Sequence, residues 1–261
     1  MEPLLIDRHD DGVVVLTLNL PERRNAMTEE LTAAWAQAVP ALAGDDTVRC
    51  VVVTGAGTAF CAGGDLSWIE GSGGLTVDDL RTRMLPFYRT WLAIRGLEVP
   101  TIAAVNGPAV GAGLAVALAC DLRYATPQAK LSAPFTALGM HPGMASTWLL
   151  PEVAGLPVAR ELLLTGRVLT GAEAVGAGLV NRTFPAESLR AEVLSIAAQV
   201  ASRAPVATRL TKVALVGGGH ANFEAALAWE SVAQPVTLAS EDLLEGLRAV
   251  REGRQPRFTG R

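Results

Sequence analysis

Two glycine-rich turns in this 261-residue chain contain the residues best suited to bind a ligand through the backbone. One is Ala62-Gly63-Gly64-Asp65-Leu66, and the other extends from Gly107 to Gly113. Because glycine has no Cβ, the chain can approach a ligand closely there and leave its N–H groups uncovered. Each turn is expected to lead into a helix, whose positive end favours a negative charge. Either segment alone could simply be a turn, but together they indicate a backbone site for a negatively charged group.

A few side chains have chemistry that such a site could use. Arg23 and Arg24 are adjacent in one loop. The forked guanidinium suits phosphate, although two arginines in a surface loop are also ordinary. His141 precedes Pro142-Gly143, and imidazole transfers protons readily near neutral pH; the alternative is that His141 caps a turn. Asp65 is expected to be structural, because an acid at the start of a helix caps that helix.

Composition limits the class of protein. The net charge is −4 and the pI is near 5.5, so there is no overall basic field for nucleic acid or an anionic membrane. The odd number of cysteines, without metal-ligand spacing and without an apolar leader, predicts a reducing, cytoplasmic location. The most apolar stretch, residues 101–119, contains Gly107-Pro108, which would break a membrane helix. We therefore expect neither a nucleic-acid nor a membrane partner.

The elements that must hold these residues alternate between strands and helices up to about residue 185. Apolar, β-branched runs at Val13–Asn19 and Val48–Thr54 predict buried strands, and Pro100 begins a third. Thr28 is expected to N-cap a helix with acids in its first turn, and residues 77–95 are again predicted to be helical. This repetition of strand, turn and helix predicts an α/β protein.

Beyond Pro185 the pattern becomes helical. An all-helical tail on an α/β core is expected to pack against a neighbour, in the same chain or in another. Residues 70–76, rich in glycine and serine, are predicted to form a mobile loop. The basic residues 251–261 are expected to be a solvated terminus. The predicted helices of the tail are residues 187–203, 206–216, 221–238 and 240–252.

Three stretches of the chain resemble the crotonase (enoyl-CoA hydratase/isomerase) superfamily. Pro21–Met27 looks like its first coenzyme-binding loop, Thr54–Leu66 is similar to its first oxyanion-hole segment, and Pro100–Arg123 to its second. The three motifs occur in the family's order and at its separations. The resemblance implies an α/β fold: a crotonase-type β-β-α spiral core over residues 1–195, followed by a C-terminal helical region, 196–261. That region is expected to mediate a homotrimer, and trimers commonly pair into a homohexamer in this family.

The same resemblance implies an acyl-CoA substrate. By position in the motifs, the N–H groups of Gly64 and Ala112 are the oxyanion-hole donors, which stabilise an enolate on the thioester oxygen. Ala112 stands where a glycine is commoner in the family. Coenzyme A enters as part of the substrate, so no separate cofactor and no metal are expected. The expected substrate and coenzyme contacts are Arg23, Arg24, Ala26, Ala62, Gly63, Gly64, Asp65, Leu66, Gly111 and Phe135.

The sequence departs from the family at its acids. Ala115, Phe135 and Gly143 stand at three positions where family members place acids, and none of these side chains can transfer a proton. No aspartate or glutamate lies between residues 123 and 150, so a small shift of register does not restore the second acid. His141 is the leading replacement.

These residues lead to two functional hypotheses. The first is an enolate-type reaction, such as hydration, dehydration or double-bond isomerisation of an enoyl-CoA, with weak ordinary hydratase activity. The alternative is a non-catalytic acyl-CoA-binding homologue that has lost its acid and base residues.

Two other enzyme classes fit less well. The turn at residues 107–113 also resembles a dinucleotide-binding turn, but no acid follows about 20 residues later. Ser132 or Ser146 with a histidine would suggest a serine hydrolase, but neither lies in a nucleophile-elbow motif. Asp121 is expected to be a buried structural acid paired with Arg123. The large apolar residues that could line an acyl pocket, or equally belong to the core, are Trp68, Met84, Phe87, Tyr88, Phe135, Met140 and Trp148.

Overall fold

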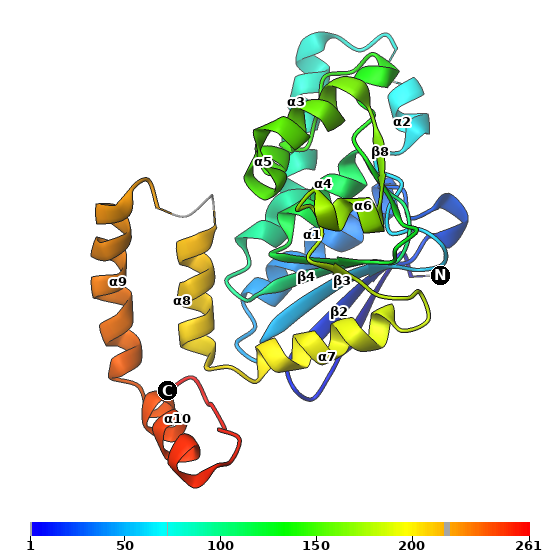
Figure 1. Cartoon of the computed structure of the whole chain (residues 1–261). Coiled ribbons are helices and arrows are strands. Elements are labelled where there is room, and N and C mark those ends of the chain that lie inside the picture. Colours follow the sequence, from blue (N-terminus) through cyan, green and yellow to red (C-terminus); the bar gives the residue numbers. More distant parts are fainter. Residues whose placement is uncertain (1, 72, 217–219) are drawn as a thin grey trace.

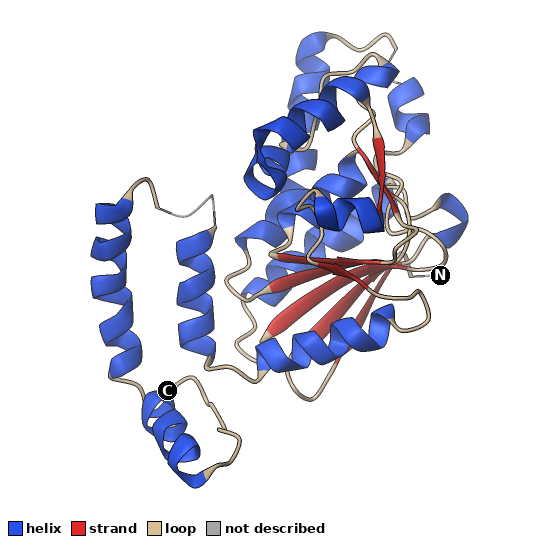
Figure 2. Ribbon diagram, in the orientation of Figure 1, coloured by secondary structure: helices blue, strands red, loops and turns tan. Residues whose placement is uncertain are grey.

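The computed structural model describes residues 2–71, 73–216 and 220–261, and a six-stranded sheet lies at its centre (Figures 1 and 2). The first two strands in the sheet order form an antiparallel hairpin, and each later neighbouring pair is parallel. Parallel strands joined by helices confirm the predicted α/β class. In sheet order the strands are β1 (Leu4–Arg8), β2 (Val13–Leu18), β3 (Cys50–Gly55), β4 (Thr101–Val105), β6 (Leu122–Ala125) and β9 (Arg182–Thr183).

The two faces of this sheet bury alternate residues of the same strands. On β3, Val51 and Val53 pack into the larger core, which also contains residues of α1 (Glu29–Ala43) and α4 (Ala112–Ala119). Val52 packs into the second core with α7 (Leu189–Ala201), which lies along the opposite face (Figure 1). Successive side chains of a strand point to opposite faces, so an uninterrupted apolar strand is the pattern that two covered faces require.

A smaller sheet holds the second glycine-rich turn. It has the order β5-β7-β8 and consists of β5 (Ala109–Val110), β7 (Lys130–Ser132) and β8 (Val168–Thr170). The Gly111 N–H donates a hydrogen bond to the Ser132 carbonyl oxygen at 2.9 Å. This sheet therefore fixes the turn before α4 beside the segment that follows Ser132.

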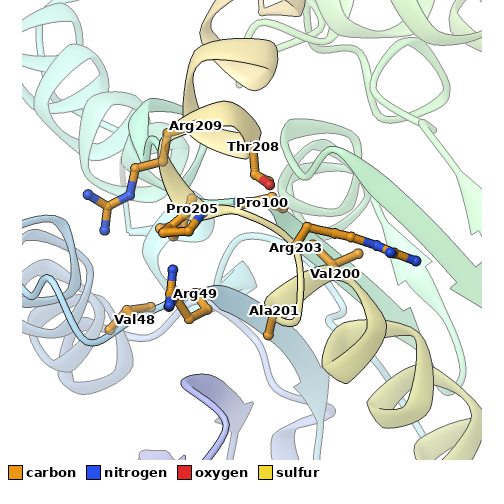
Figure 3. A pocket seen from close by; sticks show the side chains of 10 residues that line it. Val48, Arg49, Pro100, Val200, Ala201, Arg203, Pro205, Thr208 and Arg209 are labelled. Atoms are coloured by element: carbon orange, nitrogen blue, oxygen red, sulfur yellow. The ribbon is translucent and has the colours of Figure 1, made fainter. Parts of the chain in front are cut away.

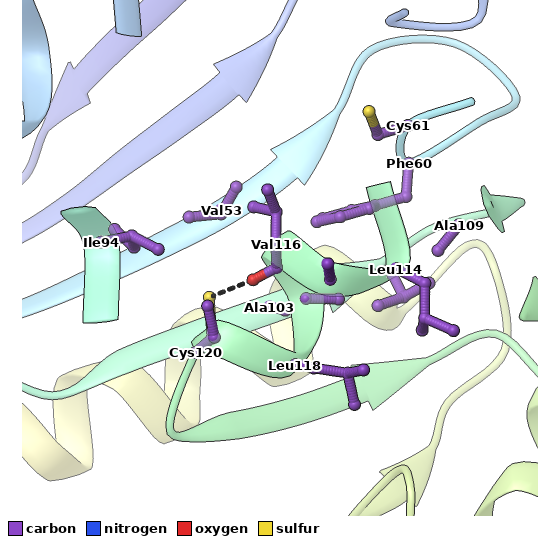
Figure 4. Close-up of a cluster of buried hydrophobic side chains, with 14 of the residues drawn as sticks. Val53, Phe60, Cys61, Ile94, Ala103, Ala109, Leu114, Val116, Leu118 and Cys120 are labelled. Carbon is purple, nitrogen blue, oxygen red and sulfur yellow. Dashed lines mark hydrogen bonds between the residues drawn. The ribbon is translucent and has the colours of Figure 1, made fainter. Parts of the chain in front are cut away.

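Helix α4 is buried on all sides, which explains its composition of small and apolar residues. Figure 4 shows its side chains between Phe60 and Cys61 on one side and the sheet on the other. A Cβ on Gly113 would collide with the Cys61 carbonyl oxygen, so only glycine permits this approach. Burial raises the pKa of the Cys61 and Cys120 thiols to about 12, which makes both thiols unreactive at neutral pH.

The predicted helix starts are largely confirmed by side-chain caps. The Thr28 hydroxyl accepts a hydrogen bond from the Leu31 N–H, and Thr76 forms a reciprocal capping box with Asp79. Residue 72, in the segment predicted to be a mobile loop, lies outside the described residues. The remaining helices of the core are α2 (Leu66–Glu70), α3 (Val77–Leu92), α5 (Ser146–Thr165) and α6 (Gly171–Gly176), with short 3-10 turns η1 (Pro21–Arg23), η2 (Ala93–Gly96) and η3 (Thr136–Leu138).

The C-terminal helices begin with α8 (Pro205–Leu215), which a buried lysine attaches to the core. The Lys212 ammonium donates to the Val99 carbonyl oxygen at 2.9 Å and lies 2.8 Å from the Asp121 carboxylate. The expectation that Asp121 pairs with Arg123 is therefore wrong. The Arg123 guanidinium instead donates hydrogen bonds to the backbone carbonyl oxygens of Cys120 and Leu179.

Helices α9 (Phe223–Leu238) and α10 (Glu241–Glu252) lie away from the sheet, with α9 beside α8 (Figure 1). The last residues are mostly exposed, as expected, but their backbone is attached to α10. The Asp242 carboxylate accepts hydrogen bonds from the N–H groups of Thr259 and Gly260 at 2.7 and 2.9 Å. The C-terminal residues are thus held against α10 by hydrogen bonds to their backbone.

The end of the core is defined by α7. Residue 195, at which we place the boundary between core and tail, lies inside this helix. Ala197 and Ala201 still pack on the sheet, so the packed core extends to the end of α7. Over residues 2–71, 73–216 and 220–261, no helix has both the length and the apolar character needed to cross a membrane.

Candidate functional site

The two glycine-rich turns line the same cleft, which has a volume of about 980 Å³. Residues of α3, of the two turns and of the segment from Pro134 to Met144 line it. The predicted site residues that line it are Ala62, Gly63, Gly64, Asp65, Gly111, Ala112, Phe135, His141 and Gly143. The side chain of Leu66 lies outside the described residues.

The two turns are in direct contact. The Val110 N–H donates to the Cys61 carbonyl oxygen at 3.0 Å. Gly63 has φ 97°, and a Cβ on it would lie 2.6 Å from the Val110 carbonyl oxygen and 3.4 Å from the Ala112 nitrogen. A side chain cannot be accommodated there, so glycine is required for the turns to meet.

The backbone amides of Gly64 and Ala112 both lie at this junction. Ala112 is the first residue of α4, where an N–H has no intrahelical acceptor. In the described part of the chain, no hydrogen bond is made by the backbone N–H of either residue. The unusual backbone angle of the turn, φ 54°, belongs to Gly111. Ala112 is not among the residues with positive φ, so alanine is tolerated in place of glycine.

The first predicted coenzyme loop is attached to this junction through its backbone. The Met27 N–H donates to the Gly63 carbonyl oxygen at 2.8 Å, and the Ala62 N–H donates to the Arg24 carbonyl oxygen at 2.9 Å. Asn25, a residue that the sequence reasoning missed, is fully buried with φ 54°. Its side chain accepts from the Leu20 N–H and donates to backbone carbonyls of residues 56 and 59. Asparagine tolerates the left-handed region better than most residues. That preference is the local signal in the sequence for Asn25 as the residue that holds this loop.

Asp65 has the structural role that its position predicts. Its carboxylate accepts from the Ser67 N–H and hydroxyl at 3.1 and 2.8 Å and from the Arg23 guanidinium at 2.8 Å. The hydrogen bonds from Ser67, followed by the charge of Arg23, lower the pKa of Asp65. Arg23 is thereby held beside Asp65, but neither Arg23 nor Arg24 is among the residues that line the cleft. Both arginines are exposed, and Arg24 has a left-handed backbone with φ 51°. Ala26 is half-buried in the same loop.

His141 lies at the cleft with one ring nitrogen already engaged. Its Nδ1 is 2.8 Å from the Pro142 carbonyl oxygen. A carbonyl oxygen only accepts hydrogen bonds, so Nδ1 carries the proton and the lone pair of neutral imidazole is on Nε2. The local contact to Pro142 that was expected of a structural histidine therefore also prepares Nε2 to accept a proton.

The three positions without acids have different environments. Ala115 is wholly buried in α4. The Phe135 ring lies over Gly111, at 3.7 Å from where a Cβ would be, and Gly143 lies against Tyr88. Of the residues that the structure describes, Glu29 and Asp65 are the carboxylates that line the cleft, and Asp65 is already paired.

Two other potential sites can be set aside. A hollow where α7 ends and α8 begins is lined by Arg49, Arg203 and Arg209 among others (Figure 3), but its volume is about 10 Å³. That is close to the space of a single water molecule. Within the described ranges, no group of three histidine, cysteine, aspartate or glutamate side chains is arranged to hold a metal ion.

Comparison with known proteins identifies the family of the chain. Residues 8–261 match the family model described as enoyl-CoA hydratase/isomerase. The chain belongs to the enoyl-CoA hydratase/isomerase family. The resemblance seen in the sequence is thus confirmed, and membership supports acyl-CoA-related catalysis.

Individual relatives agree with this assignment. The chain is 47% identical over 176 residues to a probable enoyl-CoA hydratase of Mycobacterium tuberculosis, an alignment that covers 67% of this chain and 66% of that protein. It is 34% identical to a probable enoyl-CoA hydratase of Mycobacterium bovis, over 100% of this chain and 99% of the relative. The crystal structure of enoyl-CoA hydratase from Bacillus anthracis superimposes with a TM-score of 0.93 at 33% identity, covering 99% and 100% of the two chains. The family member described here therefore has the crotonase-type fold.

Proposed function

We propose that this family member binds an acyl-CoA thioester and stabilises an enolate on the thioester oxygen with the N–H groups of Gly64 and Ala112. The observation that carries this proposal is the meeting of the two glycine-rich turns in one cleft, with both amides unpartnered. The reaction would be hydration, dehydration or double-bond isomerisation of an enoyl-CoA. Coenzyme A would enter as part of the substrate.

Electrostatic stabilisation is the chemistry that these amides can supply. Preorganised donors at about 2.7–3.1 Å from a developing oxyanion contribute roughly 3–4 kcal/mol each. The positive end of α4, which begins at Ala112, points at the same place. Ala112 is buried and Gly64 is half-buried, and both belong to turns held by backbone hydrogen bonds, so little reorganisation is needed when charge develops.

Proton transfer is the weaker part of the proposed site. Ala115, Phe135 and Gly143 cannot move protons, and each positioned acid or base typically contributes about 10²–10⁴-fold. We propose that His141 partly replaces them, with Nε2 accepting a proton from substrate or water. Hydration of crotonyl-CoA is therefore expected to be far slower than in an ordinary hydratase.

A second candidate function is acyl-CoA binding without catalysis. Two observations favour it: an apolar Phe135 ring packs over Gly111 where the family has an acid, and the Asp65 carboxylate is already paired with Arg23. The same cleft would hold the thioester, and the amides would bind its ground-state carbonyl.

The C-terminal helices support the proposal of a homotrimer or homohexamer. In the part of the chain that the structure describes, ten large apolar side chains on or beside α8, α9 and α10 are more than 40% exposed, an arrangement that favours burial against other copies. They are Val213, Leu215, Phe223, Leu227, Val232, Val236, Leu238, Leu244, Leu247 and Val250.

A panel of saturated and enoyl-CoA thioesters separates the two candidate functions. Calorimetry measures binding, and absorbance of the conjugated thioester measures turnover. Turnover of any ester excludes the binding-only function, and binding without turnover supports it. Absence of binding up to millimolar concentration would overturn both.

A further inference from the structure

Tyr88 places a hydroxyl group in the space that a side chain at position 143 would occupy. A Cβ on Gly143 would lie 2.6 Å from the Tyr88 hydroxyl oxygen and 3.1 Å from its Cζ. Tyr88 is on α3 and lines the same cleft as Gly143. Only a residue without a side chain at position 143 leaves room for the phenol. The Tyr88 hydroxyl is then the polar group at this place, where Gly143 has none.

The Tyr88 hydroxyl belongs to a largely apolar part of the cleft lining. Met84 and Phe87 of α3 line the same cleft, and so does Met140. Across the ranges that the structure describes, the Tyr88 hydroxyl is in none of the hydrogen bonds. Tyr88 is half-buried. A ligand that fills the cleft would cover this hydroxyl, which then needs a hydrogen-bond partner from the ligand.

The protonation state of the Tyr88 phenol limits which group of a ligand can pair with it. Burial raises the pKa of Tyr88 above its ordinary value, so the phenol stays neutral at physiological pH. A neutral phenol can donate one hydrogen bond and can also accept. An oxygen that accepts from the phenol is one complementary group.

We propose that the Tyr88 hydroxyl donates a hydrogen bond to an oxygen on the acyl chain, so that the cleft prefers hydroxy- or oxo-acyl-CoA thioesters to plain ones. This inference rests on the proposed function, since it assumes that the thioester occupies the same cleft. A neutral hydrogen bond of this kind changes affinity by about 3- to 10-fold. Tyr88 is then a specificity-determining residue, separate from the amides of Gly64 and Ala112.

The chain supplies its own matched control for the test. It contains two tyrosines, and Tyr124 is on β6 in the second core, with its ring 5.8 Å from that of Phe184. Tyr88→Phe and Tyr124→Phe each remove one hydroxyl and leave a ring. Calorimetric Kd values are measured for 3-hydroxybutyryl-, 4-hydroxybutyryl- and 5-hydroxypentanoyl-CoA, with butyryl- and pentanoyl-CoA as partners of equal chain length.

Tyr88→Phe is expected to weaken at least one hydroxyacyl ester by 3- to 10-fold and to change the plain esters by less than twofold. Tyr124→Phe is expected to change neither class. Gly143→Ala, which keeps the phenol but displaces its hydroxyl, should remove the same preference while the circular-dichroism spectrum is unchanged.

Three results would overturn the inference. Equal effects of Tyr88→Phe on hydroxylated and plain esters would show that the residue only packs. Retention of the preference in a folded Gly143→Ala variant would show that the place of the hydroxyl is unimportant. Failure of the wild-type protein to bind any ester would refute the proposed function itself, and this inference with it.

Discussion

Substitution of Ala112 by proline tests the oxyanion hole most directly. Proline deletes the N–H that we assign as a donor. The position is the first of α4, where the N–H has no acceptor in the helix and proline is well tolerated. The preceding residue, Gly111, has φ 54° and ψ −114°, a positive-φ conformation that glycine adopts readily.

The expected magnitude follows from that geometry. No helix hydrogen bond is lost, so the fold should survive, while catalysis should lose one preorganised donor. Loss of one such donor costs about 10²–10³-fold in kcat, or roughly 2.7–4 kcal/mol. Ala112→Gly is the matched control, because it keeps the N–H and changes helix stability by at most about 1 kcal/mol.

The assay compares kcat/KM for the best substrate of the thioester panel, with a thermal melt for each variant. Ala112→Gly should retain turnover within a few-fold, and Ala112→Pro should lose nearly all of it with a similar melting temperature. Full turnover by a folded Ala112→Pro variant would refute the assignment of this amide.

Three further predictions concern the acid–base group, the coenzyme loop and the assembly. His141→Ala should lower turnover by about 10²-fold or more and leave acyl-CoA affinity unchanged; an unchanged rate would return His141 to a purely local role. Arg24→Ala should weaken acyl-CoA binding roughly 10-fold at low salt and less at 1 M salt, where charges are screened beyond about 3 Å. Arg190→Ala on α7 is its control, and equal effects of the two changes would contradict phosphate binding by Arg24. Sedimentation at micromolar concentration should show a species three or six times 27.2 kDa, and a monomer would count against the proposed role of the C-terminal helices.

The sequence by itself determined the local elements and the place of the glycine turns. Buried strands such as Val13–Leu18 and the caps at Thr28 and Thr76 depend on residues that are close in the chain. Their periodicity and hydrogen-bonding chemistry are therefore readable without a structure. The family resemblance could likewise be found, because its motifs are local runs of residues.

Partners between distant segments were decided only by the tertiary structure. Asp121 pairs with Lys212 from α8 and not with its neighbour Arg123, and the Tyr88 hydroxyl occupies the space beside Gly143. Neither contact has a local signal. Each depends on how one helix packs against segments far along the chain, and that packing is set by burial of whole surfaces, which no spacing within a single segment encodes.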